Sequence, residues 1–301
     1  MKTFFVRTFT ALIMIGFVIA MFVLSYFVHP VFIDILILLF GWLALYELYN
    51  SFMKAEIYMF ALPLFVLAVS VFPLYYFLDL IGLVISFVVS AALAIGMFAF
   101  SKGNVGVEPA EHANSKYNGR PLIDLTSTIF AMFYPVLFLS CAFVITKNYS
   151  PIYALVFAVF MPVLCDTFAY WVGSTVKGKK LCPSISPKKT ISGAIGGLFG
   201  AMLASVIMFL IFEYFNLLPM LGYVPFTDTM WKSALIYLAI GFVGGVLSQI
   251  GDIAASRIKR AVGIKDYGNL FPGHGGAMDR LDSILFTVVL LVIAFTIIYA
   301  F

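Results

Sequence analysis

Residues 283–301 read SILFTVVLLVIAFTIIYAF, a run of 19 residues without a single charged side chain. About 20 apolar residues form a helix long enough to cross the hydrocarbon core of a bilayer. Similar runs recur along the sequence, in which 63% of residues are hydrophobic and only 11% are charged. A soluble domain carries roughly 25% charged residues. The sequence therefore predicts an all-α, polytopic integral membrane protein.

Nine segments of the chain are long and apolar enough to span a membrane, each with about 20 residues. They are residues 6–28, 31–50, 57–77, 80–101, 124–146, 151–174, 191–214, 233–251 and 283–301. The basic residues support this division, because cytoplasmic loops carry an excess of Lys and Arg. With the N-terminus inside, 16 of the 18 basic residues fall in cytoplasmic loops, and only Lys147 and Lys232 do not. We therefore expect a cytoplasmic N-terminus and an outside C-terminus.

Polar sequence collects in three of the expected inside segments, residues 102–123, 175–190 and 252–282. We divide the chain at residue 123, into N-terminal membrane helices with a cytoplasmic loop (1–123) and a catalytic membrane region (124–301). The chemistry is expected at the cytoplasmic face of the cell's inner membrane. Its main carrier is expected to be the segment 251–283, between the last two spans.

Three carboxylates flank the glycine-rich part of that segment. Asp252 follows one apolar run, whereas Asp279 and Asp282 precede the next and share one face of a helix. Carboxylate oxygens are the ligands that Mg²⁺ prefers. The pattern favours a divalent ion, with a second cation left open. The alternative is ordinary ion pairing to the neighbouring bases Arg257, Lys259, Arg260 and Arg280.

Between these carboxylates lie bases and glycines that suit a phosphate group. Lys259, Arg260 and Lys265 precede the turn Pro272-Gly273-His274-Gly275-Gly276. Glycines let backbone N–H groups form an anion-binding concavity, to which Lys and Arg add charge. His274 could donate to a phosphate or join the metal's ligands, with a purely structural role in the loop as the alternative. The combination predicts phosphoryl or nucleotidyl transfer, with a basic anchor for anionic lipid headgroups as the alternative.

A second polar cluster begins inside an apolar span. Asp166 lies in FAVFMPVLCDTFAYWVG, residues 157–173, where an ionisable group is costly and indicates function. Ser186-Pro187-Lys188-Lys189-Thr190 then leads into the next span. Lys188 and Lys189 thus stand near a helix N-terminus, which favours anions. A phosphate site shared with residues 251–283 is predicted, and an interfacial basic cluster is the alternative.

The run SRIKRAVGIKDYGNLFPGHGGAMDRLD, residues 256–282, resembles the signature of the phosphatidate cytidylyltransferases, or CDP-diacylglycerol synthases. That pattern is Ser-x-hydrophobic-Lys-Arg, four residues, Lys-Asp, a Pro-x-His-Gly-Gly turn and Asp-Arg-hydrophobic-Asp. Every fixed position is present. SPKKT at 186–190 and the Asp166-x-x-Ala-Tyr segment also resemble the family, whereas residues 1–120 match it only in hydrophobicity.

The resemblance implies the Mg²⁺-dependent reaction CTP + phosphatidate → CDP-diacylglycerol + pyrophosphate. It implies catalytic roles for Asp252, Asp279, Asp282, Lys259, Arg260, Lys265 and His274. It implies substrate contacts for Asp166, Ser186, Lys188, Lys189, Ser256, Asp266, Gly275, Gly276 and Arg280. Asp252 and Asp279 are the implied metal ligands.

Three positions depart from the family pattern. Ala255 stands where Glu commonly precedes the signature Ser, and Ser192 where Glu commonly precedes the Gly after SPKKT. Tyr267 stands where a small residue usually follows Lys-Asp. Essential roles for the missing glutamates are therefore not expected, while the three aspartates are unaffected.

The expected partners are CTP, phosphatidic acid and the lipid bilayer. A homodimer is expected from the family alone, and no nucleic acid is expected. Two other functions are kept as alternatives. A CTP-dependent polyprenol or lipid kinase would release CDP instead of pyrophosphate. A transporter of an anionic phosphate compound would show charges near the bilayer midplane and two similar halves, whereas the polar residues here crowd one face.

Overall fold

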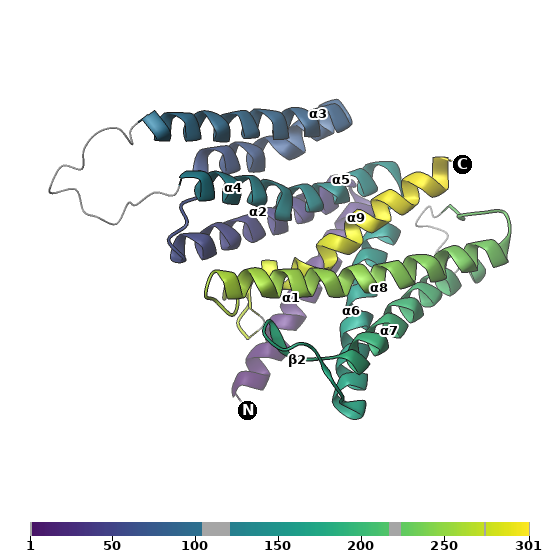
Figure 1. Cartoon of the computed structure of the whole chain (residues 1–301). Coiled ribbons are helices and arrows are strands. Elements are labelled where there is room, and N and C mark those ends of the chain that lie inside the picture. Colours follow the sequence, from purple (N-terminus) through teal and green to yellow (C-terminus); the bar gives the residue numbers. More distant parts are fainter. Residues whose placement is uncertain (1, 104–120, 217–223, 274, 301) are drawn as a thin grey trace. The chain divides into compact units, whose positions relative to one another are not determined.

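The computed structural model describes residues 2–103, 121–216, 224–273 and 275–300 (Figure 1). Its helices are α1 (Lys2–Phe27), α2 (Val31–Lys54), α3 (Ala61–Gly103), α4 (Pro121–Ala131), α5 (Phe138–Asn148), α6 (Pro151–Val176), α7 (Ile191–Phe209), α8 (Met230–Ala261) and α9 (Met278–Ala300). Short π-helical turns, Met132–Leu137 and Leu210–Tyr214, follow α4 and α7. The strands are β1 (Lys180–Cys182) and β2 (Ser186–Thr190). The all-α prediction is confirmed, with one small hairpin added.

Eight helical stretches of the described chain are long and apolar enough to cross a membrane, against nine expected spans. The difference lies in α3, which covers two of the expected spans. Its backbone leaves the helical conformation at Asp79, with φ 55° and ψ −141°. Gly82 then lies so close to the Leu74 carbonyl that a Cβ atom would overlap it. The two halves of α3 therefore run back alongside each other, as Figure 1 shows, which accounts for the ninth apolar segment.

The chain packs as two compact units, residues 38–140 and residues 1–37 together with 141–301. In the first unit, α4 holds the segment that leads into α3. Asp124 Oδ1 accepts a hydrogen bond from the Tyr58 N–H at 2.9 Å, and Thr128 Oγ1 accepts one from the Phe60 N–H at 2.9 Å. These polar side chains satisfy backbone donors just before a helix. The expected division at residue 123 is a functional one and stays a prediction.

In the second unit, glycines bring α6, α7, α8 and α9 close together. A Cβ atom on Gly200 of α7 would lie 2.5 Å from the Leu164 carbonyl oxygen of α6. A Cβ atom on Gly251 of α8 would lie 2.5 Å from the Asp282 carbonyl oxygen of α9. Small residues permit such close approach of backbones in membrane proteins. The polar ends of these helices therefore lie near one another.

A β-hairpin joins α6 to α7 and was not predicted. β1 pairs antiparallel with β2, with Lys180 opposite Thr190. Thr190 also caps α7, because its Oγ1 accepts a hydrogen bond from the Gly193 N–H at 3.1 Å. Figure 1 shows the hairpin beside the neighbouring ends of α6 and α7. It carries the predicted phosphate ligands Lys188 and Lys189 on β2.

Candidate active site

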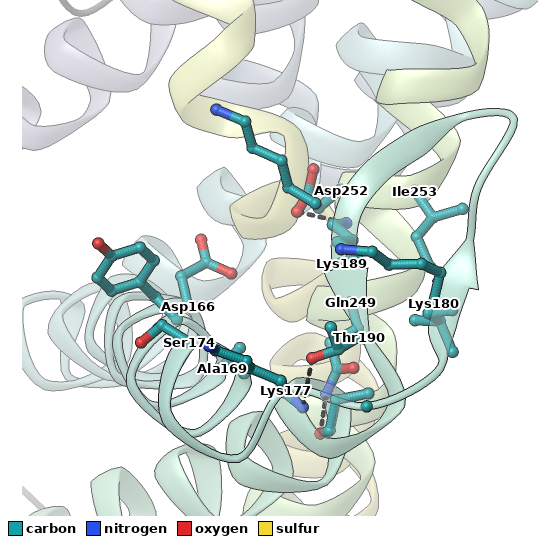
Figure 2. A pocket seen from close by; sticks show the side chains of 17 residues that line it. Asp166, Ala169, Ser174, Lys177, Lys180, Lys189, Thr190, Gln249, Asp252 and Ile253 are labelled. Atoms are coloured by element: carbon teal, nitrogen blue, oxygen red, sulfur yellow. Dashed lines mark hydrogen bonds and ion pairs between the residues drawn. The ribbon is translucent and has the colours of Figure 1, made fainter.

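A cavity of about 740 Å³ opens where α6, the hairpin, the start of α7 and the end of α8 meet. Figure 2 shows Asp166 of α6 pointing into the same space as the pair formed by Asp252 and Lys189. The charged residues lining it are four lysines and two aspartates: Lys177, Lys180, Lys188, Lys189, Asp166 and Asp252. The excess of cations makes the cavity suited to a polyanion.

An ion pair crosses from the hairpin to α8 at the cavity wall. Lys189 Nζ lies 2.5 Å from Asp252 Oδ2, and the two side chains are 24% and 27% exposed. The Nζ atom itself is buried, and among the described residues it finds no acceptor with hydrogen-bond alignment. Ser256 adds only a long hydrogen bond, 3.4 Å, from its Oγ to Asp252 Oδ1. The pair is therefore held mainly by the attraction between its opposite charges, with little contribution from hydrogen bonds.

Behind the ion pair, Gln249 joins α8 to α7. Its Nε2 donates a hydrogen bond of 3.0 Å to the Ala194 carbonyl oxygen, and the residue also lines the cavity. Gln249 and Asp252 are three residues apart, so they share a face of α8. The amide contact therefore fixes the part of α8 that presents Asp252.

A second charged cluster forms around Asp279, at the start of α9. Its Oδ1 lies 2.7 Å from Lys259 Nζ, and its Oδ2 accepts hydrogen bonds from the N–H groups of Tyr267 and Gly276, at 2.9 and 3.0 Å. The Asp279 side chain is 5% exposed. One buried carboxylate thus fastens the end of α8 and both sides of the loop between α8 and α9.

The fold of that loop depends on glycine. Gly275 has φ +84°, and a Cβ atom there would lie 3.1 Å from Asp279 Oδ2. Side chains other than glycine rarely adopt this backbone conformation. The position thus lets the following N–H, that of Gly276, reach the carboxylate. Of the glycines predicted to bind an anion, Gly276 binds the Asp279 carboxylate in this structure.

Tyr267 covers the same cluster. Its ring lies below Lys259, with Nζ 5.4 Å from the ring centroid, and its hydroxyl donates to the Ala255 carbonyl oxygen at 3.3 Å. Burial, and then the negative charges of Asp279 and Asp282, raise the pKa of the Tyr267 hydroxyl far above its usual value. Ala255 and Tyr267, two of the residues that depart from the family pattern, are therefore in contact with each other, a small residue against a large one.

Asp282 interacts electrostatically with members of both charged clusters. Its partners are Asp252 and Asp166 of the cavity and Lys259 of the Asp279 cluster. Its Oδ1 accepts a hydrogen bond of 2.7 Å from the Ser283 N–H. The cavity and the Asp279 cluster are thus linked through one carboxylate, although Asp279, Lys259 and Lys265 are not among the residues that line the cavity.

The model of the "Cytidylyltransferase family" matches residues 5–298. This chain belongs to the cytidylyltransferase family. Curated relatives named phosphatidate cytidylyltransferase come from Staphylococcus aureus (strain COL), 40% identical over 128 residues, and Rickettsia conorii, 39% identical over 127 residues. Each match covers 42% of this chain, and 43% and 50% of the respective relative. The matched stretch therefore spans about half the length of these relatives, or less.

The other predicted residues of this cytidylyltransferase-family chain are distributed over both clusters and their rim. Arg260 donates to the Ile264 carbonyl oxygen at 3.1 Å. Lys265 and Asp266 are exposed in the loop, and Ser186 pairs with Cys182 in the hairpin. Arg280 is exposed and interacts electrostatically with Asp166. His274 lies outside the described residues, as do residues 104–120 of the polar segment 102–123.

Several residues that line the cavity were not predicted from the sequence as site residues. They are Tyr170, Ser174, Lys177, Lys180 and Gln249. The two lysines had been attributed to the general excess of positive charge in inside loops, which does not single out individual residues. Gln249 did offer a signal, because a polar amide within an apolar span usually has a partner.

The predicted metal ligands agree with Mg²⁺ in their chemistry. No group of three or more His, Cys, Asp or Glu side chains in the described part of the chain could hold a metal by itself. Mg²⁺, however, usually takes one or two carboxylates and completes its shell with water and substrate phosphates. Asp252 and Asp279 are two such carboxylates, and each already neutralises a cation, Lys189 and Lys259. Both positions therefore suit positive charge.

Proposed function

We propose that this protein is a CTP:phosphatidate cytidylyltransferase that forms CDP-diacylglycerol and pyrophosphate. The observation that carries the proposal is the cavity in which four lysines and two aspartates meet at the ends of membrane-spanning helices. Such a site can bind a nucleotide from water and a lipid phosphate from the bilayer. Membership of the cytidylyltransferase family supports the nucleotide, and the names of the relatives support the lipid.

In the proposed reaction, an oxygen of the phosphatidate phosphate attacks the α-phosphorus of CTP, and the bond to the β-phosphate breaks. Pyrophosphate leaves with its electron pair. The attacking phosphate is already largely ionised, so no strong general base is required. Lys188 and Lys189 would hold the phosphates from the hairpin, while Lys259, Arg260 and Lys265 would do so from the signature segment. Fixed cations of this kind stabilise charge that develops during transfer.

Mg²⁺ is proposed as the cofactor, held by Asp252 and Asp279. When bound, it would draw negative charge from the phosphate oxygens. Asp282 and Asp166, which interact electrostatically with Asp252, would keep the surroundings favourable to cations. His274 and the glycines of the loop are proposed to contact phosphate once substrate is bound.

The proposed setting is the inner membrane, with the site at the cytoplasmic face, the N-terminus inside and the C-terminus outside. A cysteine-labelling scan of the loops on sealed vesicles tests this orientation. A homodimer, expected from the family alone, is tested by the mass of the purified protein in lipid nanodiscs.

The central test follows labelled CTP and phosphatidate with the purified protein, with and without Mg²⁺. CDP-diacylglycerol and pyrophosphate in equal amounts are expected, and only with the metal. CDP together with a phosphorylated lipid would instead identify a CTP-dependent lipid kinase. Uptake of a phosphate compound into vesicles without turnover would identify a transporter.

A further inference from the structure

Both carboxylates proposed as metal ligands are paired with a lysine. Lys189 Nζ lies 2.5 Å from Asp252 Oδ2, and Lys259 Nζ lies 2.7 Å from Asp279 Oδ1. The lysines come from different elements, β2 and α8. Both lysines were also predicted to bind phosphate. The residues proposed for the cation and those proposed for the anion therefore neutralise each other in this structure.

A metal ion and an ammonium group compete for these oxygens. At Asp279 both oxygens are already engaged, because Oδ2 accepts two backbone hydrogen bonds and Oδ1 faces Lys259. At Asp252, Oδ2 faces Lys189, and Oδ1 accepts only the long hydrogen bond from Ser256. A metal that replaces a lysine leaves a partly buried ammonium without its counter-ion, which costs free energy.

At Lys189, a bound nucleoside triphosphate would offset this cost, because its phosphates give the ammonium group a new negative partner. The ammonium is buried, lines the cavity, and has donors that find no aligned acceptor among the described residues. Three other lysines line the same space: Lys177, Lys180 and Lys188. A polyphosphate there would accept the hydrogen bonds that Lys189 lacks. It would also supply oxygens that complete the shell of Mg²⁺.

We propose, building on the function above, that Lys189 is the resident counter-ion of Asp252 and exchanges partners when substrate binds. Lys189 holds Asp252 until the metal arrives, and then transfers to phosphate. The metal alone binds weakly, since it must displace a lysine that has no other acceptor. The metal and the triphosphate together bind tightly. Each therefore raises the affinity for the other by the same factor, as linkage requires.

The test measures the affinity for Mn²⁺, a paramagnetic probe for the Mg²⁺ site, by electron paramagnetic resonance on the full-length protein in nanodiscs. Titrations are made with and without α,β-methylene-CTP, whose bridging carbon prevents transfer. In the wild type, the analogue is expected to tighten Mn²⁺ binding by about tenfold or more, within the usual range of coupling between sites.

Lys189→Met is the decisive variant, and Lys180→Met is its matched control. Lys180 lines the same cavity but makes no ion pair with a carboxylate among the described residues. Lys189→Met should bind Mn²⁺ alone about tenfold more tightly and lose most of the effect of the analogue. Lys180→Met should keep the coupling.

Two results would overturn the exchange. One is a wild-type affinity for Mn²⁺ that does not change when the analogue is added. The other is equal behaviour of Lys189→Met and Lys180→Met, which would mean that only total charge matters. Thermal unfolding of each variant confirms that it is folded, and Lys189→Arg, which retains a cation, should retain the coupling. Formation of CDP-diacylglycerol by the wild type is measured separately, so a failed exchange is distinguished from a wrong function.

Discussion

The two lysine–aspartate pairs of this molecule have the same chemistry but different surroundings. At the cavity, Lys189 and Asp252 are about a quarter exposed, and a single hydrogen bond of 3.4 Å supports the carboxylate. In the loop cluster, Lys259 and Asp279 are 12% and 5% exposed, and the carboxylate accepts two backbone hydrogen bonds besides the lysine. The first pair can change partners at low cost, whereas the second also holds the loop together.

This difference shows that the ligand role predicted for an aspartate does not exclude a structural one. Asp279 connects α8, the loop and α9, so its neutralisation should disturb the fold as well as the site. Asp252 stands on a long helix that is fixed independently through Gln249. Stability and activity measurements on the same variants can therefore separate the two pairs.

The largest effect on stability is expected for Asp279→Asn. The amide keeps the size of the side chain but leaves Lys259 without a counter-ion and turns an N–H₂ group toward donors. Breaking a buried, hydrogen-bonded pair costs about 3–5 kcal/mol. Thermal unfolding in detergent should show this loss. Asp252→Asn is the matched control, for which about 1 kcal/mol or less is expected. Equal losses in the two variants would contradict the structural distinction.

At Asp252, in contrast, the larger expected effect is on activity and the smaller one is on stability. Asp252→Asn should remain folded yet lower kcat by about 100- to 1,000-fold, the usual cost of removing one electrostatic contact in a transfer site. Asp228→Asn is the control. Asp228 precedes α8 at the opposite end from Asp252, and this variant should keep wild-type turnover. An Asp252→Asn protein with near-normal kcat would remove Asp252 from the site.

Much of the fold could be predicted, because every residue of a long apolar run indicates the same membrane-spanning helix and no single residue decides it. Even the break inside α3 lay in the gap between two predicted spans, at Asp79. The hairpin could not be predicted in the same way. Strands of three and five residues have little pattern of their own, and their pairing depends on the helices to which they are attached.

The sequence named candidate site residues but could not give their arrangement. The motif pointed to Asp252, Asp279, Lys189 and Lys259, yet spacing along the chain could not show which lysine meets which aspartate. Lys259 reaches Asp279 across 20 residues because the loop turns back at glycines with positive φ, such as Gly263 and Gly275. The turn at Gly275 lies against the Asp279 carboxylate itself, so local sequence alone does not determine it.

A smaller effect is expected at Gln249, which supports the cavity pair from behind. Gln249→Leu removes the hydrogen bond to the Ala194 carbonyl oxygen, worth about 1 kcal/mol of stability. Because Gln249 positions the turn of α8 that carries Asp252, the KM for CTP should rise several-fold with a smaller change in kcat. Steady-state kinetics and thermal unfolding of this variant check both. Unchanged KM with lowered stability would limit Gln249 to a structural role.

The smallest effect at neutral pH is expected for Tyr267→Phe, which tests the loop cluster without breaking its ion pair. The ring remains beneath Lys259, and only the hydroxyl bond of 3.3 Å to Ala255 is lost, so a cost below about 1 kcal/mol is expected. The pH dependence is more informative. Folding raises the pKa of Tyr267 above the value of about 10 that it has in the unfolded chain.

The folded protein thus retains a proton that the unfolded chain releases above pH 10, and this contribution to stability is full below pH 10 and declines as the pH rises further. Tyr267→Phe has no such proton. Its unfolding temperature, followed from pH 8 to 11 beside the wild type, should therefore fall less steeply above pH 10. Parallel curves for the two proteins would mean that the Tyr267 hydroxyl is open to solvent. The loop would then not be packed tightly around Asp279, which would contradict the structural role given to the Lys259–Asp279 pair.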